Sequence, residues 1–122
     1  MMELELVLER LKSHEKVLAV ILFGSTVRGE TTPLSDVDIA VVVEDPTPED
    51  EAELGSLYSR RIDLVLFHRL PPYIQFQVLK EGKVLYLRDK EKFKEIKFRT
   101  IRNYLEHSRM YRRVREMLLE VE

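Results

Sequence analysis

The sequence contains no cysteine and no tryptophan. Without cysteine, the chain can form neither disulfides nor thiolate metal sites. No apolar run reaches the ~18–20 residues that a membrane-spanning helix requires. The N-terminal residues Met-Met-Glu-Leu-Glu also lack the basic-then-apolar order of a signal peptide. These absences predict a cytoplasmic protein.

The length and composition predict one globular domain over residues 1–122, because 44% of the residues are hydrophobic and 34% are charged. The net charge of −2 gives no general attraction to nucleic acids or anionic membranes. The charge is uneven, since residues 80–122 carry 13 Lys/Arg and 8 Asp/Glu, whereas residues 1–79 carry 7 and 14. The basic C-terminal part predicts either a solvated helix face or a surface for phosphates or an acidic partner.

The hydrophobic periodicity predicts an alternation of strands and helices, which is typical of an α/β fold. The predicted strands cover residues 16–23, 36–44, 61–68 and 83–88, and the predicted helices cover residues 2–14, 49–59, 71–82 and 89 to the end. Residues 49–59 could instead form a loose loop, because Gly55 interrupts the segment.

Two acidic residues stand at the head of the second predicted strand. The first apolar run breaks at Gly24-Ser25, and ten residues separate Ser25 from Asp36. Because side chains alternate along a strand, Asp36 and Asp38 are expected on the same face. Two neighbouring carboxylates repel each other unless a proton or a cation lies between them. A divalent metal is the simplest occupant.

A third acid, Asp63, lies inside the apolar run of the third predicted strand, where an unsatisfied carboxylate is unfavourable. If the third strand pairs with the second, Asp63 can face Asp36 and Asp38. Three carboxylates suit Mg²⁺, which prefers oxygen ligands and leaves positions for phosphate oxygens and water. In the alternative interpretation, Asp63 forms an ion pair with Arg60 or Arg61, and the other two acids are solvated.

The residues after the first strand are suited to binding phosphate. Gly24 permits close approach of the backbone, and Ser25 with the amides that follow it offers hydrogen bonds. Ser25 can also cap a short helical turn that ends at Arg28. The guanidinium of Arg28 could neutralise a triphosphate.

The string Gly24-Ser25-Thr26-Val27-Arg28-Gly29, followed by Ser35-Asp36-Val37-Asp38, resembles the signature of the polymerase-β-type nucleotidyltransferase superfamily. It is most similar to the minimal nucleotidyltransferase branch, the MNT antitoxins, although Val27 stands where alanine is common. The resemblance covers roughly residues 15–90. It implies a polymerase-β-like α/β fold, with a small mixed sheet of about four strands flanked by helices and followed by a long C-terminal helix.

For the site, the resemblance implies that Asp36, Asp38 and Asp63 are catalytic metal ligands. Gly24 and Ser25 would then contact the nucleotide phosphates, with Mg²⁺ as cofactor and ATP as substrate.

For the function, the resemblance implies transfer of AMP from ATP to a tyrosine of a HEPN-type toxin, which makes the protein an antitoxin. One alternative is a non-catalytic antitoxin that binds nucleotide and neutralises its partner by occlusion. A weaker alternative is nucleic-acid binding through the basic C-terminal helix. That helix, at about residues 90–120, lies outside the motif and could dock a partner. The sequence leaves open whether the protein forms homo- or hetero-oligomers.

Overall fold

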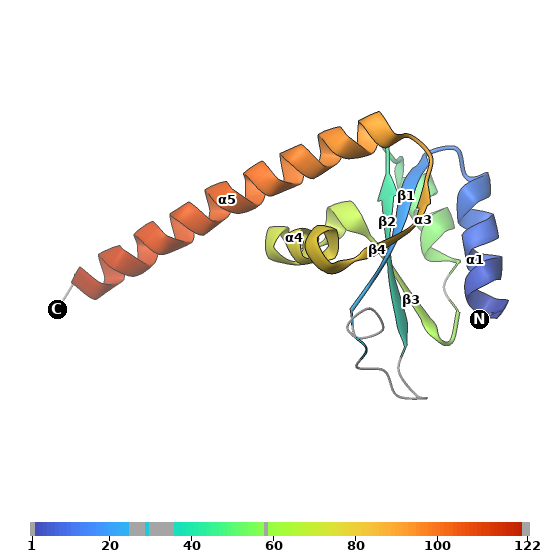
Figure 1. Cartoon of the computed structure of the whole chain (residues 1–122), viewed down its shortest axis with the longest axis horizontal. Helices are drawn as coiled ribbons and strands as arrows, with labels where there is room; N and C mark the ends of the chain where they lie inside the picture. The colour runs from blue at the N-terminus through green and yellow to red at the C-terminus, as the bar shows by residue number, and fades with distance from the viewer. Residues whose placement is uncertain (1, 25–28, 30–35, 58, 121–122) are drawn as a thin grey trace.

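The computed structural model describes residues 2–24, 29, 36–57 and 59–120. The elements in chain order are α1 (Met2–Ser13), β1 (Val17–Phe23), β2 (Val37–Val43), α3 (Pro48–Gly55), β3 (Ile62–Leu66), the 3-10 turn η1 (Phe67–Arg69), α4 (Pro72–Glu81), β4 (Lys83–Leu87) and α5 (Lys90–Glu120) (Figure 1). This order agrees with the predicted alternation of strands and helices.

The strands form one mixed sheet in the order β3-β2-β1-β4. Strand β1 is antiparallel to both β2 and β4, whereas β2 is parallel to β3. The predicted small mixed sheet of four strands is therefore confirmed. The central strand β1 is apolar at every position and buried over its first five residues, as expected for a strand covered on both faces.

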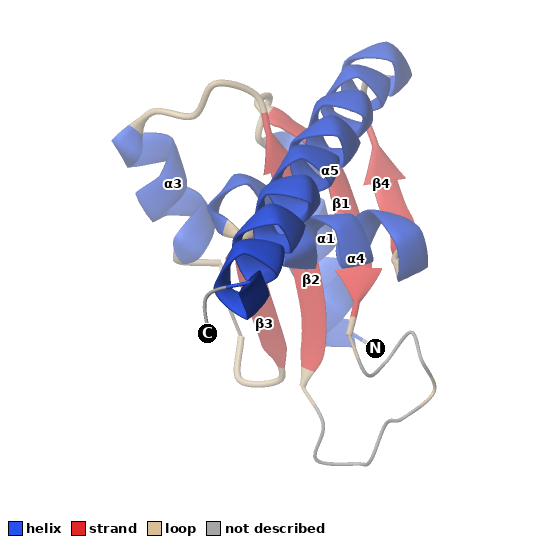
Figure 2. Cartoon of the chain, turned by 90° about the vertical axis from the view of Figure 1, so that its left-hand side faces the viewer, coloured by secondary structure: helices blue, strands red, loops and turns tan. Residues whose placement is uncertain are grey.

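Helices cover both faces of the sheet and divide the core into two clusters. The cluster under α1 and α3 takes Ile39, Val41 and Val43 from β2. The cluster under α4 and α5, which lie in front of the strands in Figure 2, takes Ala40 and Val42. Because side chains alternate along β2, even-numbered positions face α4 and α5. This alternation decides where the acidic motif points.

Of the two alternatives predicted for residues 49–59, a helix or a loose loop, the structure has a helix, α3. Its N-terminus is closed by a capping box, in which the Asp50 amide donates to Thr47 Oγ1 at 3.1 Å and the Thr47 amide donates to Asp50 Oδ2 at 2.8 Å. The helix ends at Gly55, so this glycine terminates the element.

The third strand is shorter than predicted. The prediction extended it through His68, but β3 ends at Leu66 and Phe67 begins η1. The carbonyl of Phe67 accepts hydrogen bonds from the Leu70 amide at 3.1 Å and from Gln75 Nε2 at 2.9 Å. Because these bonds engage the carbonyl, the chain turns toward α4 instead of extending the sheet.

Helix α5 packs on the sheet only along its first part. Phe93 is buried there, and the ring of Tyr104 stacks on Phe76 of α4 with centroids 4.2 Å apart. Further along, the helix projects away from the sheet (Figure 1). The apolar stripe of this helix, which begins at Phe93 and Tyr104, continues there, but Tyr111 is 80% exposed and Leu118 is 70% exposed. The second half of the stripe therefore has nothing to cover within the described chain. Among the described residues, no helix has both the length and the apolar character needed to cross a membrane.

Candidate active site

Asp38 of β2 and Asp63 of β3 are direct neighbours across the parallel strand pair. The Val37 amide donates to the Arg61 carbonyl at 2.8 Å, which fixes this register where the two strands begin. Neighbouring strands lie about 4.8 Å apart, so the two carboxylates start from adjacent backbone positions on one face of the sheet. The pairing of the third strand with the second, on which the placement of Asp63 depended, is present in the structure. Asp38 is half-buried and Asp63 is exposed.

Gly24 lies against the carboxylate of Asp38. It follows Phe23, which pairs with Asp38 across β1 and β2, and its φ of +80° is in the left-handed region. A Cβ atom on Gly24 would overlap Oδ2 of Asp38 and lie 3.2 Å from its Cγ. Gly24 was predicted to allow close approach of a phosphate. The close approach in the structure is that of Asp38, which no other residue at position 24 would accommodate without displacement.

Of the remaining predicted site residues, only Asp36 lies within the described part of the chain. Asp36 is exposed and directly precedes β2, two positions before Asp38. Ser25, Arg28 and the predicted helical turn between them lie outside the described residues. The structure thus brings Gly24, Asp38 and Asp63 together and leaves the roles of Ser25 and Arg28 as predictions.

The carboxylates of Asp36, Asp38 and Asp63 offer the oxygen ligands that a magnesium ion prefers. Like charges directly opposite each other on neighbouring strands are destabilising, and a divalent cation would offset the repulsion between Asp38 and Asp63. The oxygens of Asp36, Asp38 and Asp63 nevertheless do not gather within 4.8 Å of one another in the described part of the chain. The backbone therefore places Asp38 and Asp63 as neighbours. The carboxylate oxygens of Asp36, Asp38 and Asp63 are nevertheless too far apart to bind one metal ion together in this conformation.

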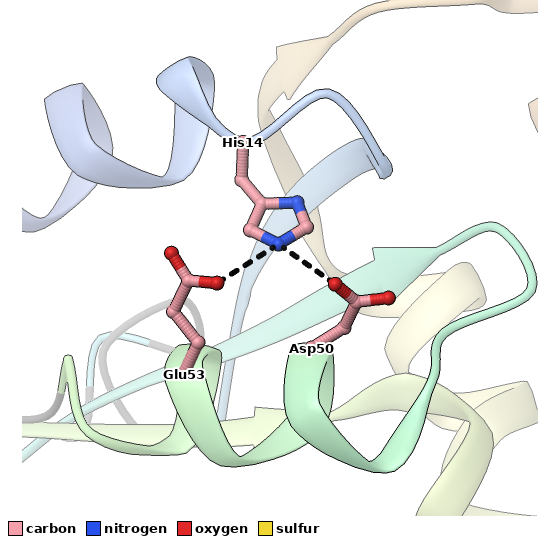
Figure 3. Close-up of side chains that lie close together, drawn as sticks. All are labelled: His14, Asp50 and Glu53. Carbon is pink, nitrogen blue, oxygen red and sulfur yellow. Dashed lines mark ion pairs between the residues drawn. The ribbon is translucent and has the colours of Figure 1, made fainter.

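A different group of three ligating side chains lies within that distance: His14, Asp50 and Glu53 (Figure 3). His14 Nε2 is 3.5 Å from Asp50 Oδ1 and 3.7 Å from Glu53 Oε2. The amide of Lys16 donates to His14 Nδ1 at 3.3 Å, which assigns the ring proton to Nε2, facing the carboxylates. A metal-binding histidine normally donates from the nitrogen that does not bind the metal. The hydrogen bonding around His14 therefore favours a cluster of polar contacts over a metal site.

Lys16 also occupies this cluster. Its Nζ lies 2.6 Å from Asp50 Oδ2, and this hydrogen bond holds the pKa of Asp50 well below its usual range and raises the pKa of Lys16. The cluster ties the start of β1 to α3. Since Gly24 follows the last residue of β1, about 20 Å of strand separates the cluster from the acidic motif. Sequence reasoning did not find the cluster, because its residues come from distant segments without a recognisable spacing.

The acidic motif on this fold defines a nucleotidyltransferase class of protein. The family model described as "Polymerase beta, Nucleotidyltransferase" matches residues 5–91. The chain belongs to this family.

A protein of Methanocaldococcus jannaschii, named as a putative protein adenylyltransferase, is 37% identical over 71 residues. The match covers 58% of this chain and 57% of that relative, so the chain spans little more than half of its length.

Two solved structures share the fold over nearly the whole chain. A toxin–antitoxin crystal structure with AMP-PNP gives a TM-score of 0.71 at 23% identity and covers 96% of both chains. A complex of a tri-AMPylated Shewanella oneidensis HEPN toxin with MNT antitoxin gives a TM-score of 0.64 at 22% identity, covering 96% of this chain and 95% of the other. The predicted fold is therefore confirmed, including the long C-terminal helix.

Proposed function

We propose that this protein is a magnesium-dependent nucleotidyltransferase that moves AMP from ATP to a hydroxyl of a partner protein. The observation that carries the proposal is the register of Asp38 and Asp63 beside Gly24 in a member of this family. The partner is inferred to be a HEPN-type toxin, because structural neighbours are toxin–antitoxin complexes that include an AMPylated HEPN toxin. The tyrosine acceptor is inferred from the resemblance of the sequence to the MNT antitoxins. The protein would then act as an antitoxin.

In this reaction Asp36, Asp38 and Asp63 would have the following roles. Asp36 and Asp38, on one face of the chain at the start of β2, would hold Mg²⁺ together with Asp63. When bound, Mg²⁺ supplies positive charge to the triphosphate oxygens. Asp63 is the exposed acid within the strand pair, so an acceptor hydroxyl can approach it from solvent. Ser25 and Arg28 would bind the phosphates.

The reaction forms one bond and breaks one. The acceptor oxygen bonds to the α-phosphorus of ATP, and the bond from that phosphorus to the oxygen bridging the β-phosphorus breaks. Pyrophosphate leaves with the bonding electron pair, while the hydroxyl proton passes to a carboxylate of the site, for which Asp63 is the accessible choice. The products are AMP-modified partner and pyrophosphate.

The test incubates the chain with ATP, Mg²⁺ and a purified HEPN-type toxin protein, followed by intact mass of both proteins. A mass gain of one or more AMP units on the partner is expected. Asp38→Asn should reduce the transfer rate by at least about a hundredfold, because it removes a charge at the reacting centre with little change in volume.

Glu9→Gln serves as the matched control, since Glu9 is exposed on α1 and removal of its charge should leave the rate unchanged. Circular dichroism of both variants establishes that the fold is intact. Equal transfer by Asp38→Asn and the parent chain would disprove the catalytic proposal.

The exposed apolar part of α5 supports a second candidate function, neutralisation by occlusion. Beyond the sheet, α5 exposes Met110, Tyr111, Val114, Met117, Leu118 and Leu119. Such a surface suits a partner protein. In this case the catalytically inactive Asp38→Asn chain would still protect cells from the toxin, whereas a catalytic antitoxin would lose protection. Growth of cells that express toxin and variant together separates the two functions.

A further inference from the structure

A cleft of about 500 Å³ lies between α5 and the end of β2, away from the acidic motif. Its floor is apolar and includes Val42, Phe67 and Ile96. Its rim carries polar side chains from one face of α5, among them Arg99, Thr100, Arg102 and Asn103. The size falls within the range of pockets that bind small molecules, and the mixture of apolar floor and few polar groups is typical of them.

Arg99 and Arg102 are about one helical turn apart, and both residues line the cleft. Within the described part of the chain, neither makes an ion pair or a hydrogen bond. Glu106 also lines the cleft and offsets one of these charges. His68, on the opposite wall, is paired with Glu51, which in turn binds Arg69. The cleft thus keeps a net positive charge, in a fork geometry suited to phosphate or carboxylate.

Thr100 gives independent support for a ligand. The residue is only 6% exposed, and it lines the cleft. We find no hydrogen-bond partner for its hydroxyl among the described residues. At the same time, no described side-chain oxygen or nitrogen is both fully enclosed and unpaired. Because Thr100 lines the cleft, a molecule bound there can supply a hydrogen-bond partner for this hydroxyl.

We propose that this cleft binds a small phosphate monoester of nucleotide size. Its phosphate would lie between Arg99 and Arg102, with a hydrogen bond to the Thr100 hydroxyl. Its apolar or aromatic part would cover Val42, Phe67 and Ile96. An acidic peptide is less favoured, because Arg99, Thr100 and Arg102 lie within about one turn of α5 and do not follow an extended groove.

The cleft is separate from the candidate active site, although both lie on the sheet face covered by α4 and α5. Val42 lines the cleft and Asp38 carries the acidic motif, and these residues are four positions apart along β2. Four strand residues span about 13 Å. The cleft also lacks the three carboxylates, so binding there needs no magnesium and does not depend on the proposed transferase function.

The test measures binding by calorimetry in the presence of EDTA, which removes magnesium from the acidic motif. AMP, inorganic phosphate and adenosine are the three probes. AMP should bind with one equivalent and at least about tenfold more tightly than inorganic phosphate, which lacks contacts to the floor. Adenosine should bind more weakly than AMP by at least about tenfold, because it lacks the anion.

Arg99→Gln and Arg102→Gln should each weaken AMP binding by at least about tenfold, and Thr100→Val by a few fold. Arg109→Gln is the matched control, since Arg109 is exposed on α5 and does not line the cleft. The Asp38→Asn variant should bind AMP as the parent does.

Any one of four results would overturn the proposal. Three of them are the absence of saturable AMP binding in EDTA, AMP binding that persists unchanged in the Arg99→Gln/Arg102→Gln double variant, and adenosine binding as tightly as AMP. Loss of AMP binding in Asp38→Asn would place the ligand at the acidic motif and would equally reject the cleft.

Discussion

The backbone of Gly24 lies so close to Asp38 that a β carbon at position 24 would occupy the place of the aspartate Oδ2. This contact joins the end of β1 to the acidic motif of β2. Position 24 therefore requires glycine for two reasons. A β carbon would overlap the Asp38 carboxylate, and the φ of +80° is unfavourable for any residue with a side chain.

We predict that Gly24→Ala loses more stability than backbone strain alone explains. A left-handed conformation costs an alanine roughly 1–2 kcal/mol, and displacement of the Asp38 carboxylate adds to this. Gly29→Ala is the control, because Gly29 has a φ of +74° but no atom within 4 Å of the place that a β carbon would take. Urea unfolding should show the larger loss for Gly24→Ala.

Removal of the Asp38 side chain should rescue part of this loss. In the Gly24→Ala/Asp38→Ala double variant the overlap disappears, so the two changes should be non-additive when compared with the single variants. Strict additivity would show that the contact between the two residues carries no energetic weight.

Replacement of Asp63 by asparagine should stabilise the protein in the absence of divalent metal. Asp63 is the register partner of Asp38, and two like charges at such positions cost about 0.2–1 kcal/mol. We expect the Tm of Asp63→Asn in EDTA to rise by about 1–4 °C. Addition of Mg²⁺ should stabilise the parent chain more than the variant. A lower Tm for Asp63→Asn in EDTA would count against repulsion between the two acids.

Acid should destabilise the protein through Glu51, which links α3 to η1. Glu51 binds Arg69 through two hydrogen bonds of 2.9 Å and also binds His68, and these bonds lower the pKa of Glu51 from 4.5 to about 2. Because the folded state has the lower pKa, this stabilisation is complete above pH 4.5 and is lost as the pH falls toward 2.

Glu51→Gln should therefore flatten the dependence of unfolding free energy on pH between 4.5 and 2. Urea unfolding at a series of pH values measures this slope. Glu49→Gln, a change two residues away at an exposed position, should keep the slope of the parent chain. An identical slope in Glu51→Gln would show that the pairing with Arg69 and His68 does not stabilise the fold.

Deletion of residues 108–122 should separate stability from partner binding. The described residues 109–119 are all exposed, so their removal takes little apolar surface out of the core. We expect the Tm to change by less than about 4 °C, which corresponds to ~1 kcal/mol for a domain of this size. Co-purification with the HEPN-type partner should be lost. A large fall in Tm would mean that the distal helix stabilises the domain itself.

Much of the fold follows from the sequence because its signals are local. Continuous apolar runs predicted β1 and β2, and hydrophobic periodicity predicted a helix over residues 71–82, where α4 lies. The pairing of Asp63 with the acidic motif could be stated only conditionally, since strand neighbours depend on the whole sheet. The early end of β3 depends on a hydrogen bond from Gln75, eight residues beyond Phe67.

The local environments of the site were harder to predict. The contact of Gly24 with Asp38 depends on one backbone angle and on the antiparallel register of β1 and β2. The cluster of polar contacts joins His14 to carboxylates of α3, far along the chain. The cleft beside Arg99 exists only because α5 crosses the end of β2. These features arise from packing between elements, which periodicity within one element does not encode.

Strand β3 lies at one border of the sheet, so one side of its backbone has no strand beside it in the described chain. Such a border can recruit a strand from another molecule and begin aggregation, and a charged side chain within it opposes that pairing. The exposed carboxylate of Asp63 therefore helps to keep separate molecules apart. A mutation that removes it would alter colloidal behaviour as well as chemistry, so loss of activity in such a variant must be judged on protein that is still monodisperse.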